Sequence, residues 1–339
     1  MREPMITVLL PVYDAQESVR RAIDSILSQS YREIELLVIN DGSQDRSLDI
    51  IRSCDDPRIR VIDLQKNGGL IAALNLGIKA ARGEFIARQD ADDESFPMRL
   101  ESQCQVLLDE PNIVAVGAAL RIVKKGNPSG EVWRYPTSAV GARWQALFKT
   151  PVAHSAVVYR RRQIVALGGY SDDFRYAEDY ELWSRLGETG GIRSLEEALV
   201  KYDVGLGGIS RAKAVEQRAV HCRIAKANMA RLLNGDVDSS VVDTLAIGVD
   251  RDEVFQELSE YARAIECLVR LYQRFVLVEQ DKYGEFSSQQ VMTDLGERFR
   301  KLIRMLPYKM RLRGLRILRR IAPTKSVSRA SMVRMLCQL

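Results

Sequence analysis

The stretch MITVLLPVYDAQESVRRAIDSILSQSYREIELLVIND, residues 5–41, contains the patterns of a strand, a helix and a second strand. An apolar run stops near Pro11, and apolar residues then recur every three or four positions along residues 19–27. Asp14 and Glu17 have the spacing of a capping box ahead of this helix. Because a buried-type strand, ELLVIN, follows, the order predicts parallel strands joined by a crossover helix.

The same alternation of strands and helices continues along the first part of the chain. It predicts further elements at residues 47–54, 59–64, 68–81 and 84–89, a helix after Pro97, a strand at 113–123 and a mixed stretch at 155–190. From about residue 211 onward only helical patterns occur. We therefore expect an α/β fold, with a mainly parallel mixed sheet flanked by helices and an α-helical C-terminal region. The expected divisions are residues 1–210, 211–297 and 298–339.

Composition and charge place the chain among globular proteins. Of its 339 residues, 46% are hydrophobic and 28% are charged. No apolar run reaches 18 residues and the first one is short, so neither a membrane span nor a signal peptide is predicted. The five cysteines lack C-x-x-C spacing, which favours a reducing cytoplasm over a disulfide framework or a thiolate zinc site.

The C-terminal tail differs sharply in charge from the rest of the chain. Residues 298–339 hold 13 Lys or Arg and no Asp or Glu, whereas residues 1–297 have a net charge of −8. Residues 300–321 have the composition of a helix in an anionic membrane interface. The apolar arc of this helix would consist of Met310, Leu315, Ile317, Leu318 and Ile321.

This charge pattern allows two interpretations of the tail. It either docks the protein on the inner face of the cytoplasmic membrane, or it packs on the body with its basic face in water. Nucleic-acid binding is not expected, because the tail has few aromatic residues to stack bases and no recognisable module.

Asp90, Asp92 and Asp93 directly follow the strand at 84–89. Each negative charge raises the cost of ionising the next, and a cation would offset that cost. A D-x-D pair suits a hard divalent ion, Mg²⁺ or Mn²⁺, whose remaining ligands are water and substrate phosphates. The alternative is an acidic surface turn in which Asp93 or Ser95 caps the next helix.

Glu178 and Asp179 form a second acidic cluster, at the start of a helix in FRYAEDYELW. A carboxylate in a first helical turn can simply offset the helix dipole. It can also be a general base that takes a proton from an attacking hydroxyl.

Three segments, VLLPVYDAQESVRRAIDSILSQSYREIELLVINDGSQDRS, NGGLIAALNLGIKAARGEFIARQDADD and GGYSDDFRYAEDYELWSRL, resemble in order and spacing the family 2 glycosyltransferases, which have the GT-A fold. The resemblance spans roughly residues 5–210. It implies an enzyme that transfers a sugar from a nucleotide diphosphate sugar, with UDP favoured, to an acceptor hydroxyl with inversion. A saccharide or lipid-linked saccharide acceptor is expected, as in cell-envelope, O-antigen or exopolysaccharide assembly, with acceptor choice in loops 124–155 and the helical C-terminal part.

The resemblance also implies individual roles for residues at matching positions. The base and ribose contacts would be Pro11, Tyr13 and Asp41, with Asp90 on the ribose side. Asp92 would bind Mn²⁺ or Mg²⁺ and the donor diphosphate. Asp179 would be the general base, with Glu178 beside it, and His154 would lie near the acceptor.

The chain departs from the family pattern after the second acidic cluster. Relatives often carry a Y-R-x-H-type segment there, whereas this chain reads KYDVGLGGIS, with Asp203 and Gly205 at the Arg and His positions. The missing His leaves open a non-catalytic nucleotide-sugar-binding regulator or scaffold on the same fold. A nucleotidyltransferase is disfavoured, because PVYDAQESVRR lacks the glycines of a phosphate loop. Since the Q-x-x-R-W signature of processive synthases is also absent, we expect one sugar to be added per encounter.

Overall fold

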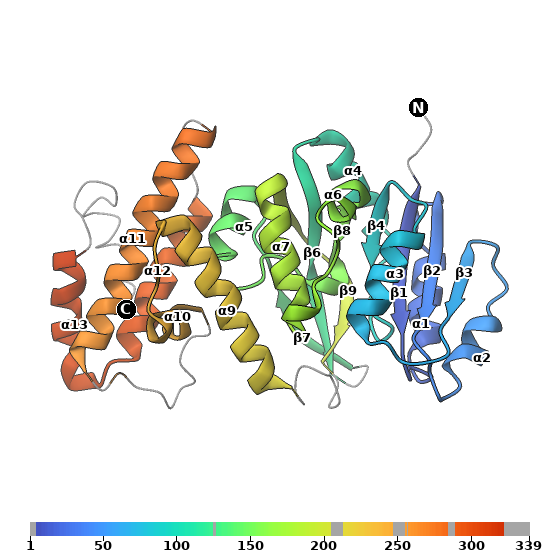
Figure 1. Cartoon of the computed structure of the whole chain (residues 1–339), viewed down its shortest axis with the longest axis horizontal. Coiled ribbons are helices and arrows are strands. Elements are labelled where there is room, and N and C mark those ends of the chain that lie inside the picture. Colours follow the sequence, from blue (N-terminus) through green and yellow to red (C-terminus); the bar gives the residue numbers. More distant parts are fainter. Residues whose placement is uncertain are drawn as a thin grey trace. The chain divides into compact units, whose positions relative to one another are not determined.

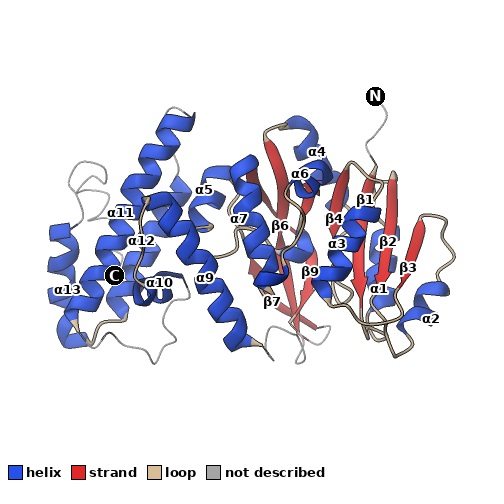
Figure 2. Cartoon of the chain, viewed as in Figure 1, coloured by secondary structure: helices blue, strands red, loops and turns tan. Residues whose placement is uncertain are grey.

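The computed structural model describes residues 5–124, 127–204, 213–246, 255, 257–283 and 289–321. The chain divides into two compact units, which we call the sheet unit and the helical unit. The sheet unit comprises Met1–Arg143 and Thr150–Gln217, and the helical unit comprises Trp144–Lys149 and Arg218–Leu339. Figures 1 and 2 show the strands in the sheet unit and only helices in the described part of the helical unit.

The sheet has nine strands among the described residues. They are β1 (Ile6–Val12), β2 (Ile34–Asn40), β3 (Ile59–Asp63), β4 (Phe85–Arg88), β5 (Glu94–Ser95), β6 (Ile113–Lys124), β7 (Asn127–Trp133), β8 (Val158–Arg160) and β9 (Gly191–Asp203). Their order is β3-β2-β1-β4-β8-β6-β9-β5, with β7 paired to β6. Strands β1 to β4 pair in parallel, as do β6 and β9, whereas β8, β5 and β7 pair antiparallel. The predicted mixed α/β sheet is confirmed.

Helices cover both faces of the sheet. They are α1 (Val19–Leu27), α2 (Ser47–Arg52), α3 (Leu70–Ala80), α4 (Arg99–Asp109), α5 (Ala139–Gln145), α6 (Arg161–Ala166) and α7 (Glu178–Thr189), with 3₁₀ turns η1 (His154–Ala156) and η2 (Asp172–Phe174). Val8 of β1 belongs to a core with α1 and α4, whereas its neighbour Leu9 belongs to a core with α3 and α7. Because both faces of β1 are buried, its sequence is a continuous apolar run rather than an alternating one.

The helical unit is built around Trp144, which lies at the end of α5. Its helices are α9 (Ala214–Leu233), α10 (Ser239–Ala246), α11 (Leu258–Tyr283), α12 (Gln289–Arg304) and α13 (Tyr308–Ile321). Trp144 is 1% exposed and donates its indole N–H to Asp294 of α12 at 2.6 Å. Among the described helices, none is long and apolar enough to cross a membrane. The expected divisions at residues 210 and 297 stay predictions.

Two local predictions are wrong. Helix α1 has Ser18 as its N-cap with no side-chain cap hydrogen bond, and Asp14 instead accepts a hydrogen bond from the Gln44 amide at 2.8 Å. The backbone turns sharply at Asp14, where φ is 46°, so its side chain reaches the loop after β2 rather than the helix. The capping alternative for Asp93 and Ser95 also fails, because the N-cap of α4 is Met98.

Candidate active site

The parallel strands β1, β2 and β4 bring three predicted site residues to one edge of the sheet. These strands are adjacent, so Tyr13, Asp41 and Asp90 follow neighbouring carboxyl ends. Tyr13 is 48% exposed, and the negative charges of Asp14 and then Asp41 raise the pKa of its phenol. Pro11 is buried within β1, opposite Ile39.

Asp41 is buried, and its carboxylate holds the start of α3. Its two oxygens accept hydrogen bonds from the amides of Gly68 and Gly69, each at 2.8 Å. Gly69 has a φ of 87°, which a residue with a Cβ rarely adopts, and α3 begins at the next position. The glycine pair in the sequence therefore fixes a turn that places α3 beside Asp41.

The three aspartates after β4 lie close together but differ in their surroundings. Carboxylate oxygens of all three lie within 4.8 Å of one another. Asp90 forms an ion pair with Arg88, and Asp93 is buried and accepts a hydrogen bond from the Asp203 amide at 3.1 Å. Asp92 reaches the surface, yet nearby protein atoms and then the Asp90 charge raise its pKa to about 6. Asp93 therefore supports the loop, while Asp92 presents its carboxylate outward.

A buried arginine, Arg99, holds the acidic loop from behind. Its guanidinium donates to the Arg88 carbonyl at 2.6 Å, to the Gln89 side-chain oxygen at 2.6 Å and to Ser95 Oγ at 2.8 Å. The amide of Gln89 in turn donates to the Asp93 carbonyl at 2.7 Å. These bonds connect both ends of the aspartate loop to the first turn of α4, which fixes the loop's backbone.

Arg88 is the central cation of the site, and our sequence interpretation missed it. Its side chain is 2% exposed; burial lowers its pKa, but the Asp90 carboxylate more than offsets this and raises the pKa above its usual range. The same positive charge acts on Asp92, Glu178 and Asp179, so it links the two acidic clusters. The sequence did contain a sign of this role, because Arg88 stands inside the apolar strand EFIARQ. A charged side chain that is buried in a strand needs a buried partner.

Glu178 and Asp179 occupy the first turn of α7. Glu178 is 7% exposed, and burial raises its pKa. Asp179 is half-buried, and burial followed by the neighbouring Glu178 charge raises its pKa to about 7. A carboxylate with this pKa can accept a proton near neutral pH, which is the property a general base requires.

His154 begins the 3₁₀ turn η1 and lies among aromatic side chains. Its Nε2 is 2.8 Å from the hydroxyl of Tyr170, and its ring centroid is 6.1 Å from that of Trp183. Burial and then the Arg88 charge lower its pKa well below the usual range. The imidazole is therefore neutral at pH 7, and its ring lies against Trp183 of α7.

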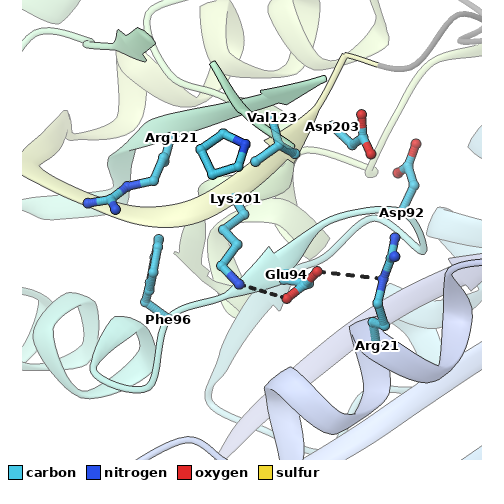
Figure 3. Close-up of a pocket in the computed structure, with 9 residues that line it drawn as sticks. Arg21, Asp92, Glu94, Phe96, Arg121, Val123, Lys201 and Asp203 are labelled. Atoms are coloured by element: carbon cyan, nitrogen blue, oxygen red, sulfur yellow. Dashed lines mark hydrogen bonds and ion pairs between the residues drawn. The ribbon is translucent and has the colours of Figure 1, made fainter. Parts of the chain in front are cut away.

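A pocket of about 160 Å³ opens beside Asp92 (Figure 3). Arg21 of α1, Glu94 of β5 and Lys201 of β9 lie along one wall, where Glu94 pairs with Lys201 at 3.0 Å and with Arg21 at 3.6 Å. Asp203 lines the pocket near Asp92 and contributes to the raised pKa of that residue. Gly205, at the position of the missing His, lies outside the described residues.

The chain matches known proteins in sequence. The family model described as "Glycosyl transferase family 2" matches residues 7–166. The putative glycosyltransferase EpsE of Bacillus subtilis is 33% identical over 58% of this chain and 72% of its own length. The amylovoran biosynthesis glycosyltransferase AmsE of Erwinia amylovora is 30% identical over 59% of this chain and 77% of its own length.

Solved structures share the fold. S. aureus TarS 1–349 in complex with UDP-GlcNAc superposes with a TM-score of 0.56 at 17% identity, covering 98% of this chain and 89% of that one. The mannosyltransferase PcManGT from Pyrobaculum calidifontis, in complex with GDP-Man and Mn²⁺, gives 0.52 at 16% identity, covering 92% and 88%. The predicted GT-A fold is confirmed. The family model and the two relatives, each matched over more than two thirds of its own length, establish that the chain belongs to glycosyl transferase family 2.

Proposed function

We propose that this glycosyltransferase transfers one sugar per encounter from a nucleotide diphosphate sugar to an acceptor hydroxyl, with inversion, in polysaccharide assembly. The relative AmsE is named for amylovoran biosynthesis, which supports a polysaccharide product. The structural neighbours were solved with UDP-GlcNAc and with GDP-Man, which supports a nucleotide-sugar donor. We favour a UDP-sugar as donor and a saccharide or lipid-linked saccharide as acceptor.

The observation that carries this proposal is the raised pKa, about 7, of the half-buried Asp179 carboxylate. In an inverting transfer, the acceptor oxygen forms a bond to the anomeric carbon while the bond from that carbon to the diphosphate breaks. The proton of the acceptor hydroxyl passes to Asp179, and the nucleoside diphosphate leaves with the electron pair of the broken bond. The charge of Arg88 acts on both acidic clusters, which supports our proposal that Asp179 and the aspartate loop serve one site.

The aspartate loop fits a divalent metal ion held chiefly by Asp92. Asp90 is paired with Arg88, and Asp93 is held by the backbone at Asp203. Asp92 is exposed, and its pKa is raised by nearby protein atoms and then by the Asp90 charge. Carboxylate oxygens are preferred ligands of Mg²⁺ and Mn²⁺. A bound ion would neutralise the charge of the leaving diphosphate. Asp90 would contact the ribose side, with Tyr13, Pro11 and Asp41 toward the base.

Transfer and product stereochemistry test the role of Asp179. A thermal-shift screen of nucleotide sugars with Mn²⁺ or Mg²⁺ first identifies the donor, because a ligand that binds the folded state raises the melting temperature. With that donor, Asp179→Asn should lower the rate of transfer or donor hydrolysis about 100-fold or more while donor binding is retained. The matched control is Asp172→Asn, at an exposed carboxylate in η2. Full activity in Asp179→Asn, or a product that retains the donor's anomeric configuration, would refute the mechanism.

Metal-dependent donor binding tests the role of Asp92. Asp92→Ala should abolish the extra thermal stabilisation that Mn²⁺ adds to a nucleotide diphosphate, because the ion would lose its chief protein ligand. Asp55→Ala, at an exposed carboxylate after α2, should behave like the unmodified chain. If Asp92→Ala kept the full metal effect, the ion site would have to be placed elsewhere.

A further inference from the structure

The apolar arc predicted for the C-terminal helix α13 packs inside the protein, so only the opposite side of this helix is free to contact a membrane or another partner. In α13, Leu318 is fully buried, and Met310, Leu315 and Ile317 are half-buried. The helix packs against α11 and α12, and Gly314 is so close to Leu306 that an added Cβ would lie 2.2 Å from that side chain. The apolar arc of the sequence pattern therefore belongs to the core of the helical unit; the side chain of Ile321 lies outside the described residues.

The opposite side of α13 presents a different set of residues, which we call the α12–α13 surface. Six exposed cations lie on it: Lys301, Arg304, Lys309, Arg313, Arg316 and Arg320. Two exposed apolar side chains accompany them, Tyr308 at 84% and Leu312 at 73%. At 100° per residue, the members on α13 span an arc of about 140° and a length of about 18 Å.

This surface carries positive charge that the helical unit does not neutralise. Within the described residues, none of the six cations forms an ion pair, and residues 298–321 contain no Asp or Glu. Arg311, which lies outside the surface, instead donates to the carbonyl oxygens of Leu306 and Arg304 at 3.2 Å. Because the surface combines positive charge with exposed apolar side chains, we expect its partner to be anionic and to accept apolar side chains as well.

We propose that the α12–α13 surface docks the enzyme on an anionic lipid bilayer. Tyr308 and Leu312 are one turn apart at the start of α13, so both can enter the interface while the cations contact lipid phosphates. A nucleic acid would use the cations but would leave Leu312 without a partner, and Tyr308 is the only aromatic residue of α13. The inference goes beyond the transfer reaction and uses none of its residues.

Vesicle flotation with the full-length chain tests this docking. Vesicles of phosphatidylcholine with about one third phosphatidylglycerol should bind the protein, and pure phosphatidylcholine vesicles should not. The triple variant Lys309→Glu, Arg313→Glu, Arg316→Glu should lower the partition coefficient about tenfold or more. The pair Tyr308→Ser, Leu312→Ser should also weaken binding, and the loss should persist at about 1 M salt, where charge attraction is screened.

A matched control distinguishes binding through the α12–α13 surface from a general effect of the protein's net charge. Lys79→Glu, Arg82→Glu, Arg162→Glu changes the charge by the same amount at exposed positions of the sheet unit and should leave binding unchanged. Equal losses in the two triple variants would overturn the proposal, as would tight binding to a DNA duplex with none to anionic vesicles. Retained helical circular dichroism and donor-induced stabilisation in each variant distinguish failed docking from failed folding or failed donor binding.

Discussion

At the scale of single residues, Asp179 couples catalysis to stability through its pKa of about 7. Because the base must be ionised, kcat/KM should rise with pH through about 7. The raised pKa means that the folded chain binds this proton more tightly than the unfolded chain, so the associated stability is present below about pH 4 and is lost as pH rises to about 7.

Asp179→Asn should therefore raise the melting temperature at pH 8, by on the order of 2 °C, and leave it nearly unchanged at pH 4. Differential scanning fluorimetry at the two pH values measures the effect. The exposed Asp172→Asn variant should show no such dependence on pH. A lower melting temperature for Asp179→Asn at pH 8 would show that the carboxylate stabilises the fold in its charged form.

Arg88 sets the ionisation of the same site from within the strand. Its charge lowers the pKa of Asp179, so Arg88→Met should move the rise of kcat/KM upward by about half a pH unit or more. Arg88→Lys retains the charge and should keep the profile closer to that of the unmodified enzyme. If Arg88→Met lowered the rate equally at every pH, the residue would act on the shape of the aspartate loop alone.

At the scale of elements, the position of the aspartate loop depends on α4. Arg99, in the first turn of that helix, is fully buried and donates to the carbonyl oxygen of Arg88, the last residue of β4, and to the side-chain oxygen of Gln89, the residue after it. Arg99→Met should cost about 2–3 kcal/mol of unfolding free energy, because buried acceptors lose a charged donor. Urea denaturation measures this loss, and Arg162→Met, at an exposed position, should cost almost nothing.

The same elements show which features the sequence could predict. Strand β1 was predictable because both of its faces are buried, so apolar residues are continuous. Strand β7 was not predicted, because NPSGEVW contains Pro and Gly and is largely exposed, as edge strands often are. The acidic clusters were visible as motifs, whereas Arg88 and Arg99 act through contacts between β4, α4 and α7 that no spacing encodes. Asp14 was misplaced because its partner, the Gln44 amide, is distant in sequence.

At the scale of the whole molecule, residues 144–149 leave the sheet unit and enter the core of the helical unit. The Trp144 ring meets Phe148, Tyr272 and Phe275 in edge-on contacts with centroids 5.1–6.1 Å apart. Arg298 of α12 lies 3.5 Å from the centroid of Phe148 and pairs with Asp294, the acceptor of the Trp144 indole. A short segment from the middle of the chain thus supplies the aromatic centre of the C-terminal unit.

This arrangement predicts that the two units respond differently to a substitution and to a ligand. Trp144→Ala removes a buried ring and its hydrogen bond, and it should cost the helical unit about 3–5 kcal/mol. In scanning calorimetry the variant should therefore show a lower-temperature transition that a nucleotide diphosphate with Mn²⁺ does not shift, together with a later one that the ligand raises. Trp133→Ala, at a half-exposed ring of β7 in the sheet unit, provides the matched control and should not produce the early transition. If the ligand raised the early transition of Trp144→Ala as much as the later one, the two units would unfold as a single cooperative body.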